Sequence, residues 1–405
     1  MIAGWGPADR SGLDPVDGGA TAADGFRGAG VISGVKPSGK PDLALLVADA
    51  PAGAAAVTTT NLVKAPACHL TDRNVANGRA QAIVINAGNA NVCTPYGEEH
   101  TQRLADTTAE QLGLDPADVL VMSTGVIGVP LPVERIEAAL PDAVAALTAD
   151  GGDAAATAML TTDTRTKQVA FRVSDEQGSC VVGGMAKGVG MIEPNMATLL
   201  VVITTDAPLA GAIAKKVLRS AVATTFNRIS VDGDGSTSDT VALLASGTAG
   251  TPPGLDTLAR AVHAVCADLA HAVVGDGEGA SRVAAITVRQ AATESDAERL
   301  ARSVATSLLV RAAIHGGDPN WGRIMMALGN AGVDVDPRRV SVRCAGVTVC
   351  RFGVAASFDR GQAAIAMRKP EITIEVDVGI GDGEATVLTC DLTPDYVRFN
   401  AEYTT

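Results

Sequence analysis

An apolar run rich in β-branched residues, Leu199 to Thr205, follows a segment that contains Gly188, Gly190 and Pro194. Such a run predicts a strand covered on both faces, because it presents no polar face to solvent. The glycines before it permit unusual backbone angles, and the proline fixes one. The chain is therefore expected to pass from a loop into a buried strand at Thr198, which would be held at the rim of a core.

A threonine at such a junction can act as an internal nucleophile. The hydroxyl of Thr198 could attack the carbonyl of Ala197 if the peptide bond between them were strained. The resulting ester would lead to a chain break and leave Thr198 with a free α-amino group. The pKa of such an amine is about 8, so the amine can serve as a general base for its own hydroxyl. A threonine that starts a strand is usually structural, and the spacing alone leaves both interpretations open.

Other strand-like and helical stretches alternate along the chain and predict a mixed α/β class. No Gly-x-Gly-x-x-Gly opens a helix after the first strand, so a dinucleotide-binding wound sheet is not indicated. The first 25 residues have little apolar periodicity and are expected to pack only peripherally. Glycine-rich residues 151–153 and 250–254 are expected to form surface loops. The predicted strands are 43–47, 82–85, 119–122, 198–205 and 372–378, and the predicted helices include 98–112 and 210–224.

Composition excludes several classes of protein. A hydrophobic fraction of 47% over 405 residues indicates a packed globular chain. The net charge of −13 argues against nucleic acid or an anionic membrane as the main partner. The seven cysteines contain no Cys-x-x-Cys and the five histidines no His-Glu-x-x-His, so we expect reduced thiols and no metal site. The N-terminus lacks a secretory pattern and no apolar run approaches about 18 residues, which predicts a cytoplasmic protein.

Two short motifs invite other interpretations, which the sequence does not support. A calcium loop starting at Asp232 would need Gly at its sixth position and Glu at its twelfth, but Thr237 and Leu243 are there. Ser33 and Lys36 fit Ser-x-x-Lys, but the companion elements of that catalytic pattern are missing. We interpret the first motif as a turn and the second as a coincidence.

The run from Lys187 to Leu200 resembles the self-cleavage segment of the ornithine acetyltransferase family, the glutamate N-acetyltransferases of arginine biosynthesis. Four further segments agree with that family in the same order, and together they span most of the chain. They are Asn86–Asn91, Ser123–Gly128, Asp318–Arg323 and Asn400–Thr405. Residues 235–239 depart from the Thr-Ser-Thr-Asn-Asp type of sequence that is more usual there.

The resemblance implies an αββα layered sandwich of the type shared with D-aminopeptidase, with a smaller C-terminal α/β domain at about 283–405. It also implies self-cleavage between Ala197 and Thr198, giving an α chain of residues 1–197 and a β chain of residues 198–405. Two copies of each chain would assemble as an α2β2 heterotetramer.

The resemblance also assigns roles to individual residues. Thr198 would be the nucleophile, and Thr124 and Gly125 would form the oxyanion hole. The substrate-binding residues would be Thr161, Lys187, Thr198, Glu278, Asn400 and Thr405. Thr162 stays an alternative to its neighbour Thr161. A lysine suits a substrate carboxylate and a glutamate suits an ammonium group. The Asp318–Arg323 block is interpreted as architectural, with Arg323 paired to an acidic neighbour.

The activity implied is transfer of an acetyl group from N2-acetyl-L-ornithine to L-glutamate through an acetyl-threonine intermediate. No metal or organic cofactor is implied, although acetyl-CoA is an additional donor for some members of the family. The alternative is an N-terminal-nucleophile aminopeptidase or amidase of the same fold, in which water takes the acyl group.

Overall fold

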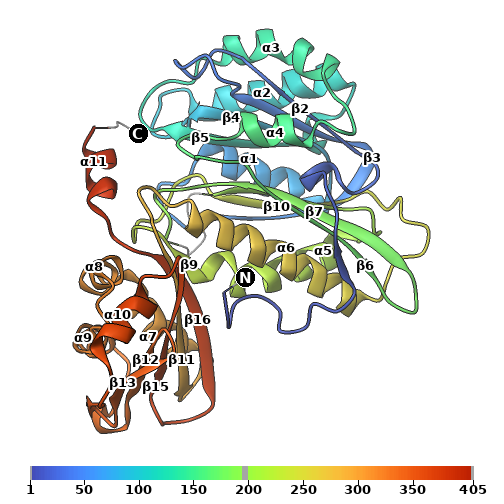
Figure 1. Cartoon of the computed structure of the whole chain (residues 1–405). Helices are drawn as coiled ribbons and strands as arrows, with labels where there is room; N and C mark the ends of the chain where they lie inside the picture. Colours follow the sequence, from blue (N-terminus) through green and yellow to red (C-terminus); the bar gives the residue numbers. More distant parts are fainter. Residues whose placement is uncertain (1, 194–198, 403–405) are drawn as a thin grey trace.

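The computed structural model describes residues 2–193 and 199–402. Ala197, Thr198 and Thr405 lie outside these residues. Within the described residues the chain forms a nine-stranded sheet and a seven-stranded sheet, with helices packed on both (Figure 1).

The larger sheet has the order β1-β6-β7-β8-β10-β3-β4-β5, and β2 pairs with β3 beside this path. Its strands β8 and β10 lie between the strand that precedes β8 in the chain, β7, and β3, which comes from much earlier. The strands are β1 (Leu13–Pro15), β2 (Phe26–Val31), β3 (Leu43–Thr58), β4 (Arg79–Asn89), β5 (Val119–Val126), β6 (Lys167–Ser174), β7 (Ser179–Lys187), β8 (Leu200–Thr205) and β10 (Thr240–Ala245).

The 16-residue strand β3 belongs to both halves of this sheet, because residues 43–47 pair with β4 and residues 53–58 pair with β10. Side chains of a strand alternate between its two faces. Leu46 of β3 therefore joins a core with Val202 of β8, whereas its neighbour Leu45 points to the opposite face of the sheet. The two halves thus pack face to face around one apolar core.

Helices cover the two outer faces of these stacked halves (Figure 1). On the β4–β5 side they are α1 (Pro66–Asn74), α2 (Gly97–Leu112) and α3 (Val133–Ala145), and on the β7–β8 side α5 (Gly211–Thr224) and α6 (Leu255–Gly275). The αββα sandwich predicted from the sequence is therefore confirmed. Helix α6 is long and apolar enough to span a membrane by composition, but 61% of its most apolar window is buried within the fold.

The smaller sheet has the order β14-β13-β12-β15-β11-β16-β9. It consists of β11 (Val283–Ala291), β12 (Ser341–Cys344), β13 (Val347–Arg351), β14 (Val354–Ala355), β15 (Glu371–Asp377), β16 (Gly383–Cys390) and the short β9 (Ile229–Ser230). Its own apolar core includes residues of α7 (Glu294–Thr306), α8 (Leu308–Gly316), α9 (Trp321–Gly329) and α10 (Arg360–Met367). Helix α11 (Pro394–Glu402) then leaves this unit and lies near the β5 end of the sandwich (Figure 1).

Short elements complete the described structure. Helix α4 (Gly152–Ala158) packs on β2 and β3. The 3-10 turns are η1 (Gly19–Thr21), η2 (Val75–Asn77), η3 (Pro116–Asp118), η4 (Phe226–Arg228) and η5 (Pro337–Arg339).

Three expectations about local structure were wrong. Trp5 is buried and its indole N–H donates to the carbonyl of Ala267 at 2.8 Å, so the N-terminal segment is anchored on α6. Gly152 is buried and starts α4 instead of a surface loop, because small residues let this helix approach the sheet closely. Arg323 donates to the carbonyl of Leu309 at 2.7 Å and, among the described residues, forms no ion pair. The expected free thiols are confirmed, and only Cys93 of the seven is exposed.

Candidate active site

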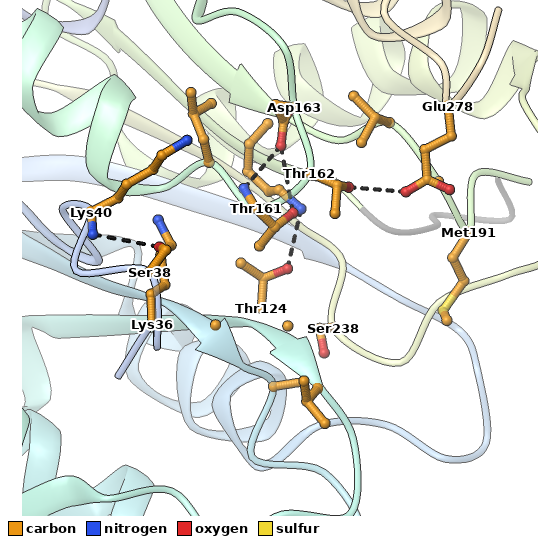
Figure 2. A pocket seen from close by; sticks show the side chains of 18 of the residues that line it. Lys36, Ser38, Lys40, Thr124, Thr161, Thr162, Asp163, Met191, Ser238 and Glu278 are labelled. Carbon is orange, nitrogen blue, oxygen red and sulfur yellow. Dashed lines mark hydrogen bonds between the residues drawn. The ribbon is translucent and has the colours of Figure 1, made fainter. Parts of the chain in front are cut away.

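A cavity of about 940 Å³ lies where the ends of several elements of the sandwich meet (Figure 2). Every site residue that was predicted from the sequence and is described by the structure lines it. These are Thr124, Gly125, Thr161, Lys187, Glu278 and Asn400. They come from β5, the loop before β6, the end of β7, the loop after α6, and α11. Ala197, Thr198 and Thr405 lie outside the described residues.

Thr124 and Gly125 lie at the end of β5, beside the end of the parallel strand β4. Gly125 has φ 129°, and a Cβ at this position would lie 2.3 Å from the carbonyl carbon of Gly88. Only glycine fits both constraints. The turn therefore brings the backbone of Gly125 and the hydroxyl of Thr124 to the wall of the cavity, the kind of arrangement an oxyanion hole needs.

Lys187 is the last residue of β7 and is only 3% exposed. Its ammonium donates to the Thr124 hydroxyl at 3.3 Å. Burial lowers the pKa of Lys187, and the nearby carboxylate of Asp163 opposes that shift. The side chain thus places a buried cation next to the predicted oxyanion turn.

Asp163 belongs to a buried charge network beneath the cavity. Lys167 contacts Asp163 and Asp276, with 2.6 Å between its ammonium and each carboxylate. Burial alone would raise the pKa of Asp163, but Lys187 and Lys167 outweigh it and lower this pKa to about 2. The backbone N–H of Gly188 also donates to Asp163 at 2.8 Å. Asp163 is therefore the fixed negative charge that holds the end of β7 in place.

Glu278 lines the cavity on the side opposite Thr124 (Figure 2). Its carboxylate accepts hydrogen bonds from the Thr162 hydroxyl at 2.9 Å and the Asn400 amide at 3.0 Å. A Cβ on Gly190 would lie 2.6 Å from this carboxylate, so a side chain there would displace Glu278 from its present position. Between the neighbouring threonines, Thr162 contacts Glu278, whereas Thr161 contacts Asp163 through its backbone N–H at 3.1 Å.

Two aspartates anchor the chain on either side of residues 194–198. Asp232 accepts from the backbone N–H groups of Met191 and Ile192, the second at 2.8 Å. Asp239 accepts from the backbone N–H of Leu199 at 2.7 Å. Asp239 is fully buried, and this burial raises its pKa well above the usual value, against the Leu199 hydrogen bond and Lys187.

A basic group of residues lines the other side of the cavity. Lys36, Ser38 and Lys40 gather there, across Thr124 from Glu278 (Figure 2). The Lys36 ammonium donates to the carbonyls of Pro41 at 2.6 Å and Ala158 at 3.2 Å. The Ser33 hydroxyl donates instead to Asp42 at 2.8 Å, so Ser33 and Lys36 do not form a serine–lysine pair.

Several of these residues were missed by the sequence analysis. Asp163 is next to predicted Thr161 and Thr162, and Asp276 is in the same turn as Glu278, so position beside a predicted residue was the available signal. Lys36 was noticed only in the Ser-x-x-Lys pattern, which was set aside, because only the fold brings its loop to the cavity. The part of the chain that the structure describes contains no cluster of three or more His, Cys, Asp or Glu side chains arranged to hold a metal ion.

Comparisons with known proteins give a consistent result. The sequence model of the ArgJ family matches residues 27–405. The arginine biosynthesis bifunctional protein ArgJ of Gloeobacter violaceus is 45% identical over 400 residues, which cover 96% of this chain and 98% of that protein. The protein of the same name from Thermus thermophilus is 46% identical over 383 residues, covering 94% and 98%.

Among solved structures, a chain of the arginine biosynthesis bifunctional protein from Bacillus halodurans is 34% identical. It covers 50% of this chain and 98% of its own length, with a TM-score of 0.49. A chain of the ornithine acetyltransferase from Mycobacterium tuberculosis, solved in complex with ornithine, is 38% identical. It covers 45% of this chain and 98% of its own length, with a TM-score of 0.42.

Proposed function

This chain belongs to the ArgJ family, and we propose that it is a glutamate N-acetyltransferase of arginine biosynthesis. It moves an acetyl group from N2-acetyl-L-ornithine to L-glutamate. The observation that carries the proposal has two parts. The family match covers residues 27–405, and the described site residues that this family predicts all line one cavity. That cavity gathers a glycine turn, a buried lysine and a glutamate from distant parts of the chain.

The first half-reaction acetylates the enzyme. The hydroxyl of Thr198 attacks the acetyl carbonyl, and Thr124 and Gly125 stabilise the oxyanion that forms. The carbon–nitrogen bond then breaks, and the α-amine of Thr198 passes the hydroxyl proton to the departing ornithine amine. The register supports this placement, because Leu200 pairs with Lys187 and the predicted nucleophile comes two residues before Leu200.

The second half-reaction regenerates the enzyme. The amine of glutamate attacks the threonine ester, the ester bond breaks, and the proton released by the amine returns to the threonine oxygen. N-Acetylglutamate leaves. Lys187 pairs with the substrate α-carboxylate and Glu278 with the side-chain ammonium of ornithine. Because the same site serves both halves, the kinetics are ping-pong, and intersecting double-reciprocal lines would contradict this mechanism.

The proposal also covers maturation, assembly and location. The chain cuts itself between Ala197 and Thr198, the fragments stay together as an α2β2 heterotetramer, and the enzyme acts in the cytoplasm. No metal or organic cofactor takes part. Acetyl-CoA is a candidate second donor, to be tested by supplying acetyl-CoA and glutamate without acetylornithine.

Intact-mass measurement of the purified protein tests the nucleophile and the cut together. Two fragments are expected, residues 1–197 and 198–405, because the new amine of Thr198 is needed as base. Thr198→Ala should give one uncut chain without transferase activity. The exposed residue Thr251 provides the control, because Thr251→Ala should be cut and active like the wild type. An uncut wild-type chain with full activity would overturn the mechanism.

Product analysis separates transfer from hydrolysis. Acetylornithine should yield N-acetylglutamate when glutamate is present, with little acetate in its absence. Acetate release that does not depend on glutamate would indicate the amidase instead.

A further inference from the structure

The two substrates of the proposed reaction differ in the charge of their side chains. Acetylornithine carries a side-chain ammonium, whereas the acceptor glutamate carries a side-chain carboxylate. Glu278 suits the ammonium and would repel the carboxylate. A cavity that serves both substrates therefore needs a cation for the acceptor, apart from the one that binds the α-carboxylate common to both.

Three lysines line the cavity, and among the described residues the ammonium groups of the two that are at least partly buried, Lys36 and Lys187, lack a carboxylate partner. Among residues 2–193 and 199–402, neither Lys36 nor Lys187 has a carboxylate oxygen within 4.0 Å of its ammonium. Lys187 lies over Thr124 and next to Asp163, where the shared α-carboxylate is proposed to bind. Lys36 is the second cation. Burial lowers its pKa to about 8, the Asp42 carboxylate opposes that shift, and the nearby Lys187 adds to it.

The fold fixes the position of Lys36. Its backbone N–H donates to Asp42 at 2.8 Å, and its ammonium uses two of its three hydrogens on the carbonyls of Pro41 and Ala158. A Cβ on Gly88 would lie 3.0 Å from the Lys36 side chain, and Gly88 in turn contacts Gly125. One backbone segment thus separates Lys36 from the predicted oxyanion turn, and one ammonium hydrogen is left for a ligand.

The neighbouring lysine fits this role less well. Lys40 is exposed, and its backbone N–H contacts Ser38 at 3.5 Å. A solvated lysine gains little from an ion pair, whereas a half-buried cation bound only to carbonyl oxygens gains more. The cavity therefore holds two fixed cations, Lys187 beside Thr124 and Lys36 across Thr124 from Glu278.

We propose that Lys36 binds the side-chain carboxylate of the acceptor amino acid and so selects a dicarboxylic acid in the second half-reaction. This assignment rests on the proposed function. Each substrate is then bound by two charged side chains. Lys187 and Glu278 bind the α-carboxylate and the ammonium of acetylornithine, and Lys187 and Lys36 bind the two carboxylates of glutamate.

Ping-pong kinetics let the two halves be measured separately. In Lys36→Met, which keeps an apolar stem but loses the charge, kcat/KM for glutamate should fall on the order of 10- to 100-fold. The burst of ornithine released from acetylornithine should keep its wild-type rate. The ratio of kcat/KM for glutamate over glutamine should collapse toward one, whereas a general structural defect would lower both values equally.

Matched variants sharpen the assignment. Lys36→Arg keeps the charge and should retain a clear preference for glutamate over glutamine. Lys215→Met, which removes an exposed lysine on α5, should behave like the wild type.

Three outcomes would overturn the proposal. They are an equal loss in both half-reactions of Lys36→Met, an unchanged preference for glutamate, or a loss of preference in Lys40→Met in place of Lys36→Met. A wild-type enzyme that makes no N-acetylglutamate would instead contradict the proposed function itself.

Discussion

Steric contact determines which residue types fit at the wall of the cavity as much as charge does. Gly125 has a backbone conformation that side chains rarely adopt, and it packs directly on Gly88 of the neighbouring strand. Its role follows from the absence of a side chain, because any Cβ would push β4 and β5 apart at the point where the oxyanion is expected. Asp163 shows the opposite principle, in which two lysines keep one buried carboxylate ionised.

Gly125→Ala should therefore impair activity and stability together. The new Cβ meets backbone atoms that cannot move independently, so we expect a loss on the order of 3 kcal/mol in the free energy of unfolding. Displacement of the donor should lower kcat by about 100-fold. Denaturant titration and acetyl-transfer assays measure the two effects.

Gly113 provides the control for this prediction. It also has a positive φ, 69°, but a Cβ there would meet no atom within 4 Å. Gly113→Ala should cost about 1 kcal/mol of stability and leave kcat unchanged. Equal effects of the two substitutions would show that backbone conformation, and not the contact with Gly88, determines the loss.

At the scale of elements, the loop that contains Asp232 and Asp239 holds both ends of the segment predicted to be cut. Asp232 binds the backbone before that segment and Asp239 binds the backbone after it. Both bonds go to main-chain N–H groups, so they fix the course of the chain whatever side chains the segment carries. This arrangement suits a peptide bond that must be presented to its own hydroxyl.

Asp239→Ala should slow self-cleavage by about 10-fold or more, since the anchor of Leu199 is lost. Asp239→Asn should restore much of the rate. Its amide oxygen can accept the same bond, and the raised pKa of Asp239 favours the neutral acid that asparagine resembles. The measurement is the uncut fraction over time by intact mass, with thermal unfolding as a check on folding. An asparagine variant as slow as alanine would point to charge and not to anchoring.

The elements that could be predicted from the sequence were those that are most fully buried. Apolar runs such as 43–47 and 119–122 appear as strands, because no other element buries such short runs on both faces. The continuation of β3 to Thr58 was missed, since the stretch from Asp49 to Gly53 interrupts the apolar pattern, although pairing with β4 resumes at Ala52. The site residues came from a resemblance, because spacing alone cannot show that Thr124 and Glu278 share a cavity.

At the scale of the whole molecule, helix α11 connects the smaller sheet unit to the active-site cavity. The helix has no buried residue, yet its Phe399 and Asn400 line the cavity and Asn400 binds Glu278. The C-terminal helix therefore contributes to the site without contributing much to the core. Changes in this helix should therefore affect substrate binding without much effect on the stability of the fold.

Ending the chain after Thr393 should shift the melting temperature by no more than about 2 °C, because α11 buries no residue. The KM for acetylornithine should rise about 10-fold, as the predicted substrate-binding residues Asn400 and Thr405 are removed and Glu278 loses a hydrogen-bond partner. Asn400→Ala should reproduce much of the rise, whereas Arg398→Ala, which removes an exposed ion pair with Asp395, should not. A large drop in melting temperature after truncation would contradict the separation of roles.

The position of β8 and β10 in the larger sheet has a further consequence. Both strands follow residue 198, yet β7 flanks β8 and β3 flanks β10, and both flanking strands precede residue 197. After the proposed cut between them, the two polypeptides would be interleaved within one hydrogen-bonded sheet and could not separate by simple undocking. Denaturation would release them as independent molecules. Folding, a first-order process before the cut, would then become a second-order encounter whose yield falls with dilution.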